Sequence, residues 1–359
     1  MRRQLIVVVS GFGITLLIVS GILSLAPSPT YAEALAQEGI DLSDKQIYFT
    51  EANNEASRFD RSPDGLSRFA SLLSELGAQL NTLEWRKGIP SDVDLIIVAG
   101  PTSVFTADQV ARLWAYLREG GQVLLLADPP SGRSPSLSQA SGFFELSWID
   151  LGFRGQDDVV VTEAETLTSG QSQSEAASSL IANFATDDLD SDHPITANLT
   201  EQLAFFGARS LRIDPLLQTE EIIPLVRSDS NFYGEIDYAT YLSAGVVEYN
   251  IAADTGRDNL ILAIAYQNTT TGARLVLVGD REFATNGGGF QTSPIYSVSL
   301  VYPDNARFLV NTASWLLDSD APELTFATPA PTGTATITPS PTVTPTLTIT
   351  PTLLPTAEE

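Results

Sequence analysis

The sequence predicts an α/β fold built on a doubly wound, mostly parallel β-sheet. Two strand–helix units in the first half of the chain carry this prediction, because each joins a short apolar strand to an amphipathic helix that ends at glycine. Strands that alternate with helices in this way form right-handed crossovers and lie parallel. The third observation is the predicted strand at residues 94–100, whose continuous apolar run from Leu95 to Ala99 is typical of a strand buried on both faces.

The first unit begins with a strand at residues 47–50, where β-branched and aromatic side chains follow one another. The next helix is predicted to begin at Ser62, which would cap it, with Pro63 in the first helical position. Apolar residues then recur at helical spacing until Gly77 ends the helix. A second strand is expected at residues 79–85.

The second unit follows the buried strand at residues 94–100. Thr106 and Gln109 match the capping box, in which a Thr hydroxyl and a Gln side chain satisfy the first amides of a helix. Gly120 ends this helix, and an apolar strand is predicted at residues 122–127. Repetition of the same strand–helix order is what predicts a sheet wound on both faces.

The second half of the chain is less regular. A helix is expected at residues 143–151, and the last helix starts near Asp304. Two apolar strands at residues 260–266 and 274–279 are separated by turn-forming residues and predict a hairpin. Shorter strands are expected at residues 159–161, 221–226 and 246–251.

Residues 1–32 are predicted to be a transmembrane anchor or a signal segment. The uncharged run at residues 5–25 is long enough, at about 1.5 Å per helical residue, to cross a bilayer core of about 30 Å. Arg2 and Arg3 would stay in the cytoplasm, which places the rest of the chain on the extracytoplasmic side. Secretory apolar segments usually run about 7–15 residues, which favours a single-pass anchor in the cell membrane over cleavage before Glu33.

Composition divides the remainder of the chain. Residues 33–326 are predicted to form the exported α/β domain, and residues 327–359 a disordered Thr/Pro-rich tail, because proline removes amide donors and fixes φ. The net charge is −25 and no basic cluster is present, so no nucleic-acid partner is expected. The chain has no cysteine, which excludes disulfides, thiolate metal sites and a cysteine nucleophile.

The candidate ligand-binding residues are Asn54, Asp128 and Asp280. Each follows a predicted strand, and in open parallel sheets ligands bind beyond the carboxyl ends of the strands. The two carboxylates are suited to a polar or cationic group. Equally, each one could cap a neighbouring helix or loop, and that is the interpretation we favour.

No catalytic residue, cofactor or metal site is predicted. His193 is the only histidine, and no nucleophile elbow accompanies it, so we interpret it as part of a turn. Asp188, Asp190 and Asp192 alternate as at the start of a calcium loop, but the required glycine and the bidentate glutamate are missing. We interpret that segment as a solvated acidic turn.

Several segments, in a fixed order, carry a resemblance to a known family. They are Asp94-Leu-Ile-Ile-Val-Ala-Gly-Pro101, Gly120-Gly-Gln-Val-Leu-Leu-Leu-Ala-Asp-Pro129, Asp192-His-Pro-Ile-Thr196, and Arg274-Leu-Val-Leu-Val-Gly-Asp280 with Phe283, Asn286 and residues 311–317. Together they resemble the auxiliary component of gliding-motility-type ABC transporters.

The resemblance implies a class I glutamine-amidotransferase-like, flavodoxin-like fold that lacks the catalytic cysteine of that enzyme class. It also implies a periplasmic or extracellular domain that works beside an ABC permease. The expected function is therefore that of a membrane-anchored, extracytoplasmic, non-catalytic accessory or binding domain, with an ABC transporter permease or another membrane protein as partner. The alternative is a cell-envelope hydrolase that uses paired carboxylates.

Overall fold

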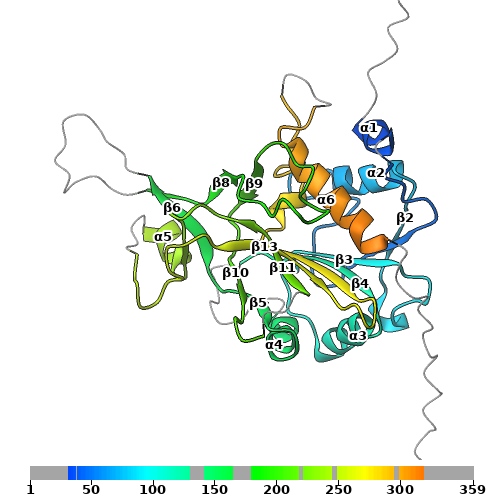
Figure 1. Ribbon diagram of the computed structural model, residues 1–359, viewed down its shortest axis with the longest axis horizontal. Helices are drawn as coiled ribbons and strands as arrows, with labels where there is room; N and C mark the ends of the chain where they lie inside the picture. The colour runs from blue at the N-terminus through cyan, green and yellow to red at the C-terminus, as the bar shows by residue number, and fades with distance from the viewer. Residues whose placement is uncertain are drawn as a thin grey trace, which may run out of the picture. The chain divides into compact units, whose positions relative to one another are not determined.

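A nine-stranded mixed sheet organises the protein (Figure 1). The computed structural model describes residues 31–37, 39–129, 141–164, 179–217, 221–244, 249–294 and 299–318. Along the sheet the strands lie in the order β2-β1-β3-β4-β14-β13-β10-β5, and β11 pairs with β13. The strands are β1 (Gln46–Phe49), β2 (Gln79–Thr82), β3 (Leu95–Ala99), β4 (Gln122–Leu126), β5 (Phe153–Gly155), β10 (Leu211–Ile213), β11 (Ile222–Arg227), β13 (Ile261–Gln267) and β14 (Arg274–Val278).

The parallel part of the sheet consists of β2, β1, β3, β4 and β14, which are parallel to their neighbours. Every residue of β3, β4 and β14 is buried, as expected for strands covered on both faces. Ile96 and Ile97 point to opposite faces and are both fully buried. The predicted α/β fold with a large parallel sheet is therefore confirmed, with an antiparallel extension at one side.

Helices cover both faces of this sheet (Figure 1). On one face, Ile97 shares a hydrophobic cluster with Phe69 of α2 (Ser67–Glu75) and Phe308 of α6 (Pro303–Leu317). On the other face lie α3 (Ala107–Arg118) and α4 (Ser141–Asp150), joined by an edge-to-face contact between the rings of Trp114 and Phe143. The remaining helices are α1 (Tyr31–Gln37), α5 (Tyr238–Ala244), and the 3₁₀ turns η1 (Trp85–Lys87) and η2 (Glu282–Ala284).

The predicted start of α2 at Ser62 is wrong. Ser62 lies in a turn where its backbone N–H donates to Oδ1 of Asp60, and α2 begins five residues later at Ser67. No side chain of the same segment caps the helix; instead Oδ1 of Asn286 accepts the N–H of Arg68 at 3.0 Å. A residue distant in the sequence therefore supplies the capping acceptor, and local signals alone do not show it.

The start of α3 follows the prediction. The hydroxyl of Thr106 accepts the N–H of Gln109 at 3.2 Å, and Oε1 of Gln109 accepts the N–H of Thr106 at 2.8 Å. This capping box is complete, and Gly120 follows the helix with a φ of 100°.

The second half of the chain builds the antiparallel extension and two small sheets. Strands β13 and β14 pair antiparallel, which confirms the predicted hairpin. Residues 245–248 of the strand expected at 246–251 lie outside the described part of the chain, and residues 249–251 belong to no strand. The small sheets are β12-β6-β7 (Tyr233–Glu235, Val159–Ala164, Ser179–Ile181) and β8-β9 (Asn183–Thr186, Leu203–Phe206).

The predicted membrane segment and the predicted tail are not tested by these elements. Residues 5–25 and 327–359 both lie outside the described residues. Among the helices of the described part, none combines the length and the apolar character that a membrane span requires.

Candidate functional site

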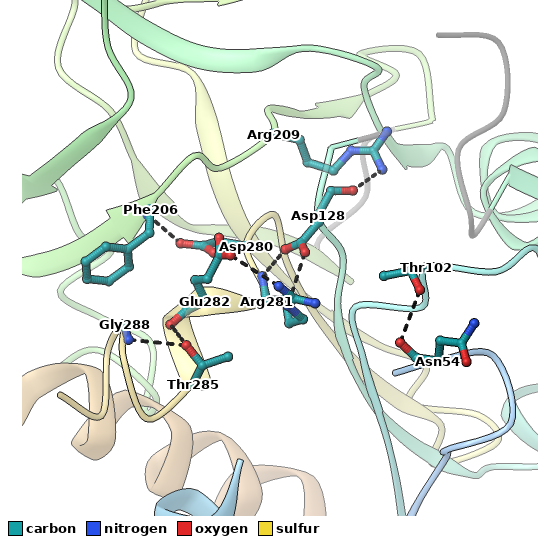
Figure 2. A network of polar contacts seen from close by, with 10 residues as sticks. All are labelled: Asn54, Thr102, Asp128, Phe206, Arg209, Asp280, Arg281, Glu282, Thr285 and Gly288. Carbon is teal, nitrogen blue, oxygen red and sulfur yellow. Dashed lines mark hydrogen bonds and ion pairs between the residues drawn. The ribbon is translucent and has the colours of Figure 1, made fainter. Parts of the chain in front are cut away.

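The carboxyl ends of β4 and β14 bring two of the three candidate residues together. Leu126 and Val278 are register partners in this parallel pair, and Asp128 and Asp280 each lie two residues further on. The carboxylates of Asp128, Asp280 and Glu282 approach one another within 4.8 Å (Figure 2). Neighbouring parallel strands thus place residues that are distant in the sequence in one acidic cluster, which we call the carboxylate cluster: Asp128, Asp280 and Glu282.

Asp128 is held by two arginines. Its Oδ1 accepts the backbone N–H of Arg281 at 2.6 Å, and its Oδ2 lies 3.3 Å from Nε of the same residue. Its backbone carbonyl accepts Nη1 of Arg209 at 2.9 Å. Burial raises the pKa of the Asp128 carboxyl, and the charge of Arg281 opposes that effect.

Asp280 is the most enclosed member of the cluster and is fully buried. Its Oδ2 accepts the N–H of Phe206 at 2.7 Å, whereas its Oδ1 has no hydrogen-bond partner among the described residues. Burial, together with the neighbouring charges of Asp128 and Glu282, raises the pKa of Asp280 well above its usual range. This carboxyl therefore favours its protonated form or a nearby positive charge.

Arg281 lies between the cluster and the end of β3. Its Nη2 is 3.2 Å from Oε1 of Glu282, so one guanidinium contacts two of the three carboxylates. Gly100, which follows β3, has a φ of +61°, and a Cβ added there would lie 2.2 Å from Cδ of Arg281. Glycine is therefore required at position 100 both for the backbone conformation and for the path of the arginine side chain.

Arg209 fixes the connection between β9 and β10 to the end of β4. Its side chain is only 1% exposed, and its Nε donates to the carbonyl of Gln156 at 2.6 Å. Its Nη2 pairs with Oδ1 of Asp157 at 2.7 Å, and the guanidinium lies 5.0 Å from the ring centre of Phe144. Arg209 thus ties the end of β4 to the antiparallel extension.

Asn54 lies apart from the carboxylate cluster (Figure 2). It is exposed, has a φ of +54°, and its Nδ2 donates to Oγ of Ser103 at 2.8 Å. Its carbonyl accepts the hydroxyl of Thr102 at 3.3 Å. Asn54 therefore joins the loops that follow β1 and β3, and no hydrogen bond links it to Asp128 or Asp280 in the described part of the chain.

A crevice of about 530 Å³ opens on the same edge of the sheet, beside β1 and β2. The strand order reverses between β1 and β3, and such reversals are where open α/β sheets bind ligands. The crevice also reaches the first turn of α3. Its lining residues are Glu51, Ala52, Thr82, Leu83, Glu84, Trp85, Arg86, Thr106, Asp108, Gln109 and Arg112.

No sequence pattern singled out Arg209, Arg281, Glu282 or the crevice. Arg281 and Glu282 directly follow Asp280, so their position after a buried strand was an available signal. Arg209 offers no comparable signal, because it lies in a short connection between two short strands.

The other candidates considered in the sequence lie at different places. Nδ1 of His193 accepts the N–H of Ile195 at 3.2 Å, and its ring packs against Trp315 with 5.1 Å between the ring centres. His193 is thus built into a turn, as interpreted from the sequence. In the acidic turn, Oδ1 of Asp190 accepts the N–H of Asp192 at 3.0 Å, so this carboxylate supports its own loop.

Comparison with known proteins assigns the family. A family model described as an ABC-type uncharacterized transport system matches residues 44–312, well over half of the 359 residues. The chain belongs to this family. Membership gives this ABC_transp_aux chain a transport-associated role, in association with an ABC-type transport system. No curated protein matches the sequence at a significant level.

Several solved structures resemble the fold only distantly. The mmIFT52 N-terminal domain is 16% identical with a TM-score of 0.48, covering 76% of this chain and 98% of that chain. A putative ThuA-like protein from Bacteroides uniformis is 13% identical with a TM-score of 0.38, covering 77% and 93%. A β-galactosidase from Rahnella sp. R3 is 9% identical with a TM-score of 0.37, covering 77% of this chain and 31% of that chain.

Proposed function

We propose that this ABC_transp_aux chain is a non-catalytic accessory subunit of an ABC transporter of the gliding-motility type. The folded domain acts on the extracytoplasmic side of the cell membrane, where the segment at residues 5–25 holds it. It binds its permease partner or a transported ligand through the carboxyl edge of the sheet. The parallel strand order β2-β1-β3-β4-β14, which is that of flavodoxin-like sheets, supports this placement of the binding surface.

The observation that carries the proposal is that the carboxyl edge has two parts, the carboxylate cluster and the open crevice. The acidic groups that could perform chemistry are engaged by backbone amides and arginines, and Asp280 is fully buried. The crevice beside β1 and β2 is open and mixes apolar and charged side chains. An edge whose carboxylates are engaged by amides and an arginine, with an open crevice beside them, suits binding better than turnover.

A hydrolase remains the second candidate, because the carboxylates of the cluster lie within 4.8 Å of one another. Glycosidases place two carboxylates on either side of the bond that they cleave. Asp280 has no exposed surface with which to contact a substrate, and this favours the binding function. Turnover of a glycan or peptide from the cell envelope by the purified full chain, abolished in Asp128→Asn, would overturn the non-catalytic assignment.

The binding surface is tested by filling the crevice. Ala52 is exposed and lines the crevice, so Ala52→Trp should block it without disturbing the core. The matched control is Ala115→Trp, on the exposed side of α3 outside the crevice. We expect the tagged full chain to co-purify with an ABC permease from native membranes, with loss of the permease in Ala52→Trp only. Equal recovery with both variants would rule out the crevice as the contact surface.

The anchor is tested by the mature N-terminus. We expect the protein to fractionate with membranes and to keep the residues before Glu33. N-terminal sequencing that begins at Glu33 would show cleavage and would remove the proposed means of attachment.

A further inference from the structure

We propose that Asp128, Asp280 and Glu282 form a binding site for a hard divalent cation, such as Mg²⁺, Ca²⁺ or Mn²⁺. Each residue offers a carboxylate oxygen, and these oxygens lie within 4.8 Å of one another (Figure 2). Carboxylate oxygens are the ligands that such cations prefer in proteins. The proposal does not depend on the transport role, because it rests on the cluster alone.

The unpartnered oxygen of Asp280 is the observation that distinguishes this cluster from an ordinary acidic surface. Asp280 is fully buried, and its Oδ1 has no hydrogen-bond partner among the residues that the structure describes. A buried acceptor left without a donor or a cation costs free energy. The backbone N–H of Phe283 is close enough to lower the pKa of this carboxyl, but Oδ1 has no hydrogen bond of normal geometry to any described residue. Its other neighbours, Asp128 and Glu282, are carboxylates and supply no donor when ionised. A cation would satisfy all three groups at once.

The charge of the site agrees with a divalent ion. Three ionised carboxylates carry three negative charges, and Arg281 supplies one positive charge through its contacts with Asp128 and Glu282. Two negative charges are left in the cluster. The charge of Arg209 also acts on Asp128, but it is offset by the ion pair that Arg209 makes with Asp157.

The three ligands are held in place by backbone contacts. The N–H of Phe206 fixes Oδ2 of Asp280, and the N–H of Arg281 fixes Oδ1 of Asp128. The carbonyl of Glu282 accepts the N–H of Gly289 at 2.9 Å, which anchors the third ligand's backbone. Such outer contacts orient metal ligands and raise affinity.

An ion has a route into the site. The side chain of Asp128 is 24% exposed and that of Glu282 is 38% exposed, whereas Asp280 forms the closed end. Water from this open side would complete the coordination, as is usual for Mg²⁺ and for sites with few protein ligands. The competing account is a proton held on Asp280 and shared with a neighbouring carboxylate, with no ion involved.

Binding of Mn²⁺ separates the two accounts. The full chain is freed of metal with EDTA, exchanged into chelator-free buffer and titrated with Mn²⁺, while free Mn²⁺ is followed by electron paramagnetic resonance. Thermal unfolding is followed in parallel, with Ca²⁺ and Mg²⁺ as competing ions. We expect one saturable site and a rise in the unfolding midpoint with ion concentration.

Two variants locate the ion. Asp280→Asn keeps the shape of the side chain and the contact with Phe206, and should weaken Mn²⁺ binding at least tenfold. The matched control is Asp192→Asn, which makes the same charge change in the exposed acidic turn and should leave binding unchanged. If Asp280→Asn fails to fold, Glu282→Gln is measured instead, with the same expected loss.

Three results would overturn the proposal. They are the absence of saturable Mn²⁺ binding at millimolar concentration, unchanged binding in the Asp280→Asn or Glu282→Gln variant, and equal weakening in Asp192→Asn. None of these results bears on whether the chain contacts a permease, so the two proposals fail separately.

Discussion

The two edges of the parallel sheet use polar residues in different ways. At the amino edge, Oδ2 of Asp94 accepts the N–H of Gln46, Nη1 of Arg274 donates to the carbonyl of Trp315, and Nδ1 of His193 accepts a backbone N–H. Each of these side chains contacts the backbone. At the carboxyl edge, the carboxylates of the cluster also converge on one another, and two of them contact one arginine.

This difference separates a supporting polar group from a candidate site. A side chain that completes a backbone hydrogen bond lowers the cost of burying that backbone. Carboxylates that lie close together repel one another when ionised. They are stabilised by a positive charge nearby or by a proton on one of them. Convergence, more than the presence of charged residues, makes the carboxyl edge the candidate functional edge.

The largest loss of stability is expected from a charge placed in the buried centre of the sheet. Ile97 is fully buried in the centre of β3, so Ile97→Asp places an unpaired charge in the core and should cost several kcal/mol, on the order of the whole stability. The control is Ile149→Asp on α4, where the side chain is 69% exposed and the change should be nearly neutral. Urea unfolding checks both, and a cooperatively folding Ile97→Asp would contradict the buried parallel sheet.

The parallel half of the fold could be predicted because its signals are local. The apolar run of β3, the capping box of α3 and the glycine after it lie within thirty residues of one another and act on neighbouring residues. The placement of Asp128 beside Asp280 was also within reach, since both follow a buried strand and neighbouring parallel strands end at one edge.

The remaining features depend on contacts between distant residues. Asn286 caps α2 from 218 positions away, so the weaker local signal at Ser62 was misleading. Strand β12 pairs with β6 across some seventy residues, and three-residue strands carry little periodicity to detect. Arg209 acts through carbonyls and a carboxylate on other segments, which no pattern around position 209 reveals.

One buried arginine lies at each edge, and removing each in turn measures how much it contributes to stability. Arg209→Met leaves the backbone carbonyls of Gln156 and Asp128 without their donor and should lower the free energy of unfolding by about 3 kcal/mol. Arg274→Met at the amino edge removes contacts with the end of α6 and should cost less, about 1–2 kcal/mol. Denaturant midpoints decide the order. A larger loss in Arg274→Met would mean that the amino edge carries more of the stability.

Two glycines test the close approach of Arg281. Gly100→Ala and Gly207→Ala both place alanine at a positive φ, +61° and +71°, which costs about 1 kcal/mol in either case. Only at Gly100 does the new Cβ meet Arg281, whereas nothing lies within 4 Å of a Cβ at Gly207. Gly100→Ala should therefore be less stable by a further 1–2 kcal/mol or so. Equal losses in urea unfolding would show that Arg281 moves aside without cost.

The smallest expected effect is a pH dependence of opposite sign at the two edges. The pKa of Asp280 is raised by burial and by Asp128 and Glu282, so above about pH 4 the folded state keeps a proton that the unfolded state has released. Stability then falls as the pH rises through that range. The pKa of His193 is lowered by burial, so below about pH 6.5 the unfolded state binds the extra proton, and stability falls as the pH falls.

Neutral variants separate these two contributions. In EDTA, Asp280→Asn should flatten the loss of stability that the wild type shows as the pH rises above about 4, because its amide does not titrate. His193→Gln should instead flatten the loss on the acid side and leave the alkaline side unchanged. Urea midpoints at pH 5, 6, 7 and 8 measure both slopes. If Asp280→Asn kept the wild-type slope, Asp280 would already be ionised in the folded state, and the demand for positive charge at the carboxyl edge would be met by Arg281 alone.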